Sequence, residues 1–239
     1  MYAVEEQLWW FRGLRDVITE TLQRNVPVNS KIADAGCGTG INSQMLKGLG
    51  YEVESFDLSD QAIMYCKKRG IEKAQVGSVT KMPIKSSSMH ALIMMDVLSM
   101  LHPDEVRLAI NETYRVLKPG GLALFQVAAF EWLRSGHDQV SQVQKRYSIA
   151  ELEAFFDTKQ WQINYKSYRI WLLFPLLACV KILKRVLLSH PNQATGDLWL
   201  PPAILNKILF TIQWCENKLL RFFPLPWGSS VFMVVEKKH

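Results

Sequence analysis

The chain has 239 residues and a mass of 27.5 kDa, which is enough for one well-buried α/β domain and short for two independent domains. Hydrophobic residues make up 49% and charged residues 21% of the chain, a composition that excludes a disordered protein. The net charge of +6 is spread along the sequence, with no basic run longer than Lys67 to Arg69. We therefore expect no nucleic-acid partner.

The first residues and the cysteines indicate the compartment. The N-terminus has no basic start followed by an apolar stretch, as a secretory signal would, so a cytoplasmic protein is expected. The four cysteines are widely spaced, contain no C-x-x-C pair and have no neighbouring histidine. Reduced thiols are therefore expected, and no zinc site.

Helix and strand patterns alternate along most of the chain. Apolar residues recur at every third or fourth position from Glu5 to Arg24, which predicts an amphipathic helix. The segments that follow predict a mainly parallel, doubly wound α/β sheet of seven strands in a single domain, residues 1–239. The expected strands are 31–36, 51–59, 73–79, 90–98, 122–128, 161–170 and 229–238, and the expected helices are 41–50, 60–70, 103–121 and 148–160.

A long insertion, residues 171–228, separates the last two expected strands. Connections in compact domains are usually a few residues long, so this segment is expected to have structure of its own. Its first part, "WLLFPLLACVKILKRVLLS", is almost entirely apolar, with Lys181, Lys184 and Arg185 on one helical face. This helix is too short and too charged to span a membrane.

The second part of the insertion repeats the pattern, which predicts a hairpin of two antiparallel amphipathic helices. The insertion carries a net charge of +4, and a basic amphipathic hairpin is typical of a peripheral membrane contact. A packing lid over the substrate and a homodimer interface are the two alternatives. In the second helix Leu205, Ile208, Leu209, Ile212, Leu219, Leu220 and Phe223 share one side, and Asn206, Lys207, Asn217, Lys218 and Arg221 lie largely opposite.

A glycine-rich turn, "DAGCGTG" at residues 34–40, follows the first expected strand directly and precedes a helix. Glycines let the backbone bend tightly and approach a ligand, while the start of the helix presents unpaired N–H groups. The spacing is neither that of a dinucleotide site nor that of a P-loop. Asp57, at the end of the second strand, can accept hydrogen bonds from both hydroxyls of a ribose. Together these features predict a site for a nucleoside-like ligand.

With these motifs the sequence resembles the class I S-adenosylmethionine-dependent methyltransferases over essentially the whole chain. "DAGCGTG" is similar to their first motif, "GSVTKMPIKSSSMHALIMMDVL" to their adenine-side loop and fourth strand, and "VLKPGG" to their post-helix turn. "LWWFRGLRD" and "SGHDQVSQVQKRYS" further resemble a bacterial branch similar to ubiquinone-type O-methyltransferases. The resemblance implies a seven-stranded Rossmann-like methyltransferase sheet.

The resemblance also implies the residues that hold the cofactor, S-adenosyl-L-methionine. The turn lines the methionine end, Asp57 holds the ribose and Leu58 packs on the adenine. Ser78 stands where the family often has an aspartate that accepts from the adenine amino group, and Arg12 is expected to reach the cofactor carboxylate. The full set implied is Arg12, Asp34, Ala35, Gly36, Gly38, Asp57, Leu58, Ser78, Val79 and Asp96.

Two histidines are the candidates for catalysis. His137, in the loop after the fifth strand, is the first choice, and His102, just after the fourth strand, is the second. The ubiquinone-type relatives carry an E-x-x-E-H metal motif where this chain has Asp96, Ser99 and Met100, so no metal is expected. Asp138, Arg146 and Tyr147 are the candidates for binding the acceptor.

The sequence thus predicts a methyltransferase that acts on a hydroxyl of a small molecule, which is lipid-, prenyl- or sugar-linked. Methyl transfer to a small amine is the first alternative, and a non-catalytic module that binds S-adenosylmethionine is the second. The protein is expected in the cytoplasm, with the insertion at 171–228 placing it at the inner face of the membrane.

Overall fold

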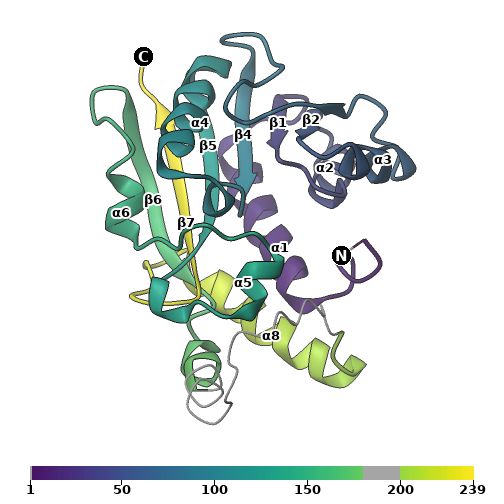
Figure 1. Ribbon diagram of the computed structural model, residues 1–239, viewed down its shortest axis with the longest axis vertical. Coiled ribbons are helices and arrows are strands. Elements are labelled where there is room, and N and C mark those ends of the chain that lie inside the picture. Colours follow the sequence, from purple (N-terminus) through teal and green to yellow (C-terminus); the bar gives the residue numbers. More distant parts are fainter. Residues whose placement is uncertain (1, 180–199) are drawn as a thin grey trace.

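The computed structural model describes residues 2–179 and 200–239 of the chain. Its centre is a seven-stranded sheet in the order β3-β2-β1-β4-β5-β7-β6 (Figure 1). Strands β1 to β5 run parallel to one another, whereas β7 is antiparallel to both of its neighbours, β5 and β6. The strands are β1 (Lys31–Ala35), β2 (Glu52–Asp57), β3 (Gln75–Val76), β4 (Met89–Met95), β5 (Leu117–Ala128), β6 (Trp161–Arg169) and β7 (Ser230–Lys237).

Helices cover both faces of the sheet, as expected for a doubly wound α/β fold. Successive residues of a strand point to opposite faces, so Ala33 and Ala35 join one core and Ile32 joins the other. The first core packs against α4 and α6, and the second packs against α1 and α2. The helices are α1 (Trp9–Asn25), α2 (Ile41–Gly48), α3 (Asp60–Lys68), α4 (Pro103–Val116), α5 (Gly136–Val140), α6 (Ile149–Glu153) and α8 (Ala203–Leu219).

Outside the insertion the predicted strands and helices are found in the predicted order, and the largest difference is in the length of α6. The end of the helix predicted over 103–121 was wrong, because α4 ends at Val116 and residues 117–121 belong to β5, where Leu117 pairs with Met89 of β4. The sequence predicts a helix over 148–160, but α6 ends at Glu153. Its start is as expected, because Ser148 caps the helix and the Glu151 carboxylate accepts from the Ser148 N–H. Asp157 then begins a turn, in which its carboxylate accepts from Lys159 N–H and its carbonyl accepts from Trp161 N–H. These local hydrogen bonds compete with continuation of the helix.

The insertion at 171–228 is described in two pieces. Helical turns occupy residues 174–179, and the long helix α8 lies along α1 at one end of the molecule (Figure 1). Lys181, Lys184 and Arg185, and with them most of the first predicted helix, lie outside the described residues. The pairing of two antiparallel helices therefore stays a prediction. Among the described helices, none is long and apolar enough to cross a bilayer.

The orientation of α8 differs from the one expected. The sequence predicts Asn206 and Asn217 on an outer polar side, but both are buried. Asn217 Nδ2 donates to the Gly13 carbonyl at 2.8 Å, and Lys218 on the same helix pairs with Glu20 at 3.0 Å. The prediction was wrong for these two asparagines, because α1 presents polar partners that an isolated hydrophobic pattern does not reveal.

Candidate functional site

The glycine turn after β1 presents one open position to a ligand. Gly36, Gly38 and Gly40 all have positive φ, at +73°, +54° and +84°, which favours glycine over any other residue. A Cβ on Gly36 would lie 2.4 Å from a methyl carbon of Val97, and one on Gly40 would lie 2.9 Å from the Cys66 sulfur. A Cβ on Gly38 would meet no atom within 4 Å. Gly36 and Gly40 therefore pack against the protein, whereas Gly38 faces open space.

Asp57 lies beside this open position, at the carboxyl end of β2. Its Oδ2 accepts from Gly38 N–H at 2.9 Å, and its Oδ1 accepts from Ser59 N–H at 2.9 Å. Each carboxylate oxygen has a further lone pair, so the group can still accept from two hydroxyls of a ligand. The neighbouring Leu58 is 75% exposed, an apolar surface next to the carboxylate on which a flat ring can pack.

Asp34 lies beneath the turn and supports it from below. Its Oδ2 accepts from the Ser43 hydroxyl at 2.6 Å, and Ser43 in turn accepts from Ser55 at 2.8 Å. The side chain is 1% exposed, and burial raises the pKa of its carboxyl to about 7. Ala35 is also fully buried. The side chains of both residues shape the turn from inside the protein. That Asp34 helps to hold the cofactor stays a prediction.

The buried position of Asp34 predicts an unusual dependence of stability on pH. Because its folded-state pKa is raised from 3.8 to about 7, the folded protein keeps a proton that the unfolded chain releases between these two pH values. The contribution of Asp34 to the free energy of unfolding should therefore fall as pH rises through this range. Asp34→Asn removes this titration. The free energy of unfolding of the variant minus that of the wild type should therefore increase by on the order of 4 kcal/mol between pH 4 and pH 7.

Urea denaturation at a series of pH values measures this difference. Asp60→Asn is the matched control, because Asp60 is an exposed acid in the first turn of α3, and its curve should run parallel to the wild type. If the free energy of unfolding of Asp34→Asn also ran parallel to that of the wild type across this pH range, Asp34 would be ionised in the folded protein already at acidic pH.

The N-terminal segment is fastened over the glycine turn by a buried ion pair. The Glu5 carboxylate, 2% exposed, accepts from the Thr39 hydroxyl in the turn and pairs with Arg69 at 2.7 Å. Arg69 Nε donates to the Thr39 carbonyl at 3.1 Å. Sequence reasoning missed Glu5 and Arg69, because no local pattern links two charged residues so far apart in the chain.

Arg12 lies at a cavity next to this segment. Its guanidinium stacks on the Phe210 ring, with the central carbon 3.9 Å from the ring centroid. The cavity has a volume of about 620 Å³ and lies between the N-terminal segment and the first turns of α8, with Glu6 and Lys207 in its lining. That Arg12 reaches the cofactor carboxylate stays a prediction.

Asp96 closes the other side of the turn, at the carboxyl end of β4. Its backbone has φ +63°, and the residue after it, Val97, packs on Gly36. The Gln126 amide donates to Asp96 Oδ2 at 2.9 Å, and Arg169 from β6 donates to the Gln126 oxygen. Burial raises the pKa of Asp96 to about 6, against the opposing effect of the Gln126 hydrogen bond. Sequence reasoning found Asp96 but missed its supports, Gln126 and Arg169.

Ser78 and Val79 follow β3, on the adenine side of the predicted site. The Ser78 hydroxyl lies 2.8 Å from the Thr80 hydroxyl and accepts from Thr80 N–H at 3.1 Å. Val79 is 7% exposed, and its side chain belongs to the hydrophobic core. The Ser78 hydroxyl is thus partly occupied by hydrogen bonds within its own turn. Val79 can present only its backbone to a ligand.

The two candidate catalytic histidines lie in different settings. His102 is the N-cap of α4, and its side chain is 73% exposed, with Nδ1 3.6 Å from the Asp104 carboxylate. This is the position of a residue that begins a helix at the surface. His137 lies in α5, in the segment that follows β5. Its role as a base stays a prediction.

The three predicted acceptor residues form a buried support. Asp138 is 1% and Arg146 7% exposed, and they pair at 2.6 Å, while Arg146 also donates to the Ala129 carbonyl at 2.9 Å. Tyr147 is fully buried in the core. Contact of Tyr147 with an acceptor does not fit this structure, because the hydrophobic residues around the ring leave none of its surface open. The ion pair instead fixes the path of the chain between β5 and α6.

A search for metal-ligating clusters covers the two described ranges, 2–179 and 200–239. No three side chains of histidine, cysteine, aspartate or glutamate converge there in a way that could hold a metal ion. Ser99, at the position of the relatives' metal motif, is fully buried, and its hydroxyl accepts from Ala128 N–H at 2.9 Å.

Comparisons with known proteins identify the fold and match part of the chain to a family. The family described as a methyltransferase domain matches residues 33–125, the stretch that runs from β1 through the glycine turn and Asp57 into β5. The solved structure of a TehB-like SAM-dependent methyltransferase from Corynebacterium glutamicum superposes on this chain with a TM-score of 0.58 at 16% sequence identity. The match covers 95% of this chain and 88% of that protein's chain. Residues 33–125 thus match a methyltransferase domain, and the whole chain has the fold of the S-adenosylmethionine-dependent methyltransferases.

Two curated relatives match only part of the chain. The malonyl-[acyl-carrier protein] O-methyltransferase of Pectobacterium atrosepticum is 29% identical over 122 residues, which is 50% of this chain and 47% of that protein. Squalene methyltransferase 1 of Botryococcus braunii is 33% identical over 111 residues, 43% of this chain and 28% of that protein. The chain thus spans about half the length, or less, of these two curated relatives.

The residues of this methyltransferase fit the family's adenosyl cofactor. The open space in front of Gly38 gives the backbone a place to approach the ligand, and the Asp57 carboxylate keeps free lone pairs for ribose hydroxyls. The exposed Leu58 offers a surface for the adenine. These three features lie on adjacent parallel strands at their carboxyl ends, where doubly wound folds bind ligands.

Proposed function

We propose that this chain transfers the methyl group of S-adenosylmethionine to an oxygen atom of a small molecule. The observation that carries the proposal is the open glycine position, Gly38, hydrogen-bonded to Asp57. The open position lies at the carboxyl ends of adjacent parallel strands, beside a carboxylate with free lone pairs, and doubly wound folds bind their ligands at these ends.

The acceptor we propose is a hydroxyl of a lipid-, prenyl- or sugar-linked molecule. The names of the relatives support an oxygen or a lipid-like acceptor, since one is a malonyl-[acyl-carrier protein] O-methyltransferase and another is a squalene methyltransferase. The bound cofactor supplies an electrophilic methyl group. The protein then has to orient the acceptor in line with it and accept the hydroxyl proton. His137 and His102 are the proposed bases, and Asp96, with its pKa near 6, is a third group suited to this task.

Binding of the cofactor is the first test, by isothermal titration calorimetry with S-adenosylmethionine and S-adenosylhomocysteine. The wild type should bind both. Gly38→Ala should bind at least tenfold more weakly, because its methyl group occupies the open space. Gly48→Ala is the matched control, since a Cβ there also meets no atom within 4 Å but lies at the end of α2, away from the turn. No heat of binding for the wild type with either compound would overturn the proposal.

Turnover separates the proposed activity from its alternatives. The release of S-adenosylhomocysteine should be followed with lipid extracts and with defined hydroxyl and amine acceptors, and the methylated product identified by mass spectrometry. A methyl ether or ester supports the proposal, whereas a methylamine supports the N-methyltransferase. Cofactor binding without turnover on any acceptor supports the non-catalytic module.

A further inference from the structure

Helix α8 is held to the body of the protein by polar side chains. The Asn206 side chain accepts from Trp9 N–H at 2.9 Å and donates to the Gln7 carbonyl at 2.8 Å. Glu216 accepts from the backbone N–H of Leu172 at 3.0 Å. A helix that packs on a domain normally buries an apolar stripe. In this helix the buried residues are instead all polar: Asn206, Gln213, Glu216 and Asn217.

Several apolar residues of this helix and of the turn after it lie at the surface. Ile204 is 79% and Phe222 80% exposed, and the Trp214 ring is 43% exposed. Soluble proteins rarely leave large apolar side chains clustered at the surface unless something covers them. We call this group the α8 apolar surface: Ile204, Leu205, Ile208, Trp214, Phe222 and Phe223.

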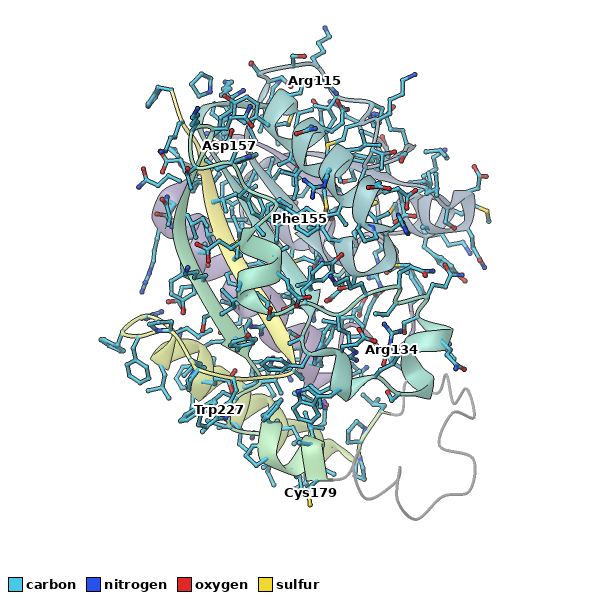
Figure 2. The ribbon with its side chains drawn as sticks, turned by 60° about the vertical axis from the view of Figure 1, so that its left-hand side comes forward. Arg115, Arg134, Phe155, Asp157, Cys179 and Trp227 are labelled. Atoms are coloured by element: carbon cyan, nitrogen blue, oxygen red, sulfur yellow. The ribbon has the colours of Figure 1, made fainter. Side chains whose placement is uncertain are left out.

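Further exposed apolar residues lie at the same end of the molecule. Leu176, in the helical turns at 174–179, is 62% exposed, and Trp227 is 46% exposed. Figure 2 shows Cys179 and Trp227 at the lower end of the molecule together with α8. The carboxyl end of β4 points toward this end as well (Figure 1). The apolar residues therefore lie on the side of the sheet where the acceptor is expected.

The exposed charges of the α8 segment itself are basic. Between Leu200 and Val235 the only acidic residue of the sequence is Glu216, which is 1% exposed. Lys207 is exposed on α8. Lys218 and Arg221 both pair with one carboxylate, that of Glu20, so this group keeps a net positive charge. Bases beside exposed aromatic rings are typical of proteins that contact anionic lipid headgroups.

We propose that the α8 apolar surface docks on the surface of an anionic lipid bilayer. The phenylalanine and tryptophan rings enter the boundary between headgroups and acyl chains, and the bases lie at the level of the phosphates. Polar side chains already fasten the helix to α1, so its apolar residues are free to face the lipid. This contact needs neither cofactor nor acceptor, so it stands apart from the proposed methyl transfer.

Cosedimentation of the full chain with vesicles tests the proposal, at roughly 0.1 M salt, where surface charges still act over about 10 Å. Vesicles of phosphatidylcholine and phosphatidylglycerol in a seven-to-three ratio are compared with pure phosphatidylcholine. The wild type should partition to the mixed vesicles at least tenfold more strongly. The double variant Ile204→Ser/Phe222→Ser should lose at least tenfold of that partitioning, because both side chains are at the surface and their loss leaves the core intact.

The matched control is Val28→Ser/Leu108→Ser, which removes two side chains of similar exposure, 62% and 52%, from other parts of the surface. It should bind vesicles as the wild type does. A charge variant, Lys207→Glu, should weaken binding to the mixed vesicles and leave binding to phosphatidylcholine unchanged, whatever the behaviour of the double variant.

Three results would overturn the proposal. The first is a wild type that stays in the supernatant with both kinds of vesicle. The second is a folded Ile204→Ser/Phe222→Ser variant that binds as strongly as the wild type. The third is a dimer in light scattering without vesicles that this double variant converts to a monomer, since a second copy of the chain would then cover the surface.

Discussion

Asp57→Ala should weaken the binding of S-adenosylhomocysteine by roughly 100-fold. The carboxylate is expected to accept from two ribose hydroxyls, and a hydrogen bond to a charged group contributes about 1.5–3 kcal/mol. The substitution also removes the acceptor for Gly38 N–H, so the turn loses a support on its ligand side. Isothermal titration calorimetry measures the change.

Two further variants make this result specific. Asp60→Ala, a few residues away and exposed, should bind like the wild type. Asp57→Asn keeps one acceptor oxygen and should lose less affinity than Asp57→Ala. An affinity for Asp57→Ala within threefold of the wild type would show that the ribose is held elsewhere.

Arg169→Met should produce the largest loss of stability. The Arg169 side chain is fully buried. It donates to Gln126 on β5 and, with the Gln213 amide turned so that its oxygen faces the guanidinium, to Gln213 on α8 at 2.9 Å. Burial lowers its pKa to about 10, while the nearby Glu216 carboxylate favours the charged form. Removing one member of such a buried polar group leaves the others unpaired, at a cost of roughly 3–5 kcal/mol.

Thermal unfolding measures this loss, and for a chain of this length the melting temperature should fall by roughly 10 °C. Lys166→Met is the matched control on the same strand, because Lys166 is 44% exposed and pairs only at the surface, with Glu153. Its melting temperature should stay within roughly 2 °C of the wild type. An Arg169→Met variant as stable as the wild type would mean that Gln126, Gln213 and Glu216 find other partners.

The order of the elements and the cofactor turn could be predicted because their signals are local. A strand such as β4 shows a continuous apolar run, and the turn at 34–40 is marked by its glycines. Asp57 follows from its place at the end of the next strand. Each of these features needs only neighbouring residues in the sequence, so a single chain is enough to recognise it.

The supports of the site could not be predicted, because their partners lie far apart in the chain. Glu5 pairs with Arg69, and Gln126 joins Asp96 to Arg169, through contacts that exist only once the sheet has formed. Tyr147 shows the opposite error. The resemblance to the O-methyltransferase branch suggested a place at the acceptor site, but the ring lies in the core.

The sequence by itself determined the α/β class, the order of the strands along the chain and the glycine turn, because periodicity and turn chemistry act over a few residues. Only the tertiary structure decided which glycine faces open space and which carboxylates are buried. It also decided which side of α8 is exposed. The helix has apolar and polar residues enough to pack either way. Its polar residues turn inward because α1 offers them the Trp9 N–H, the Gly13 carbonyl and the Asp16 carboxylate.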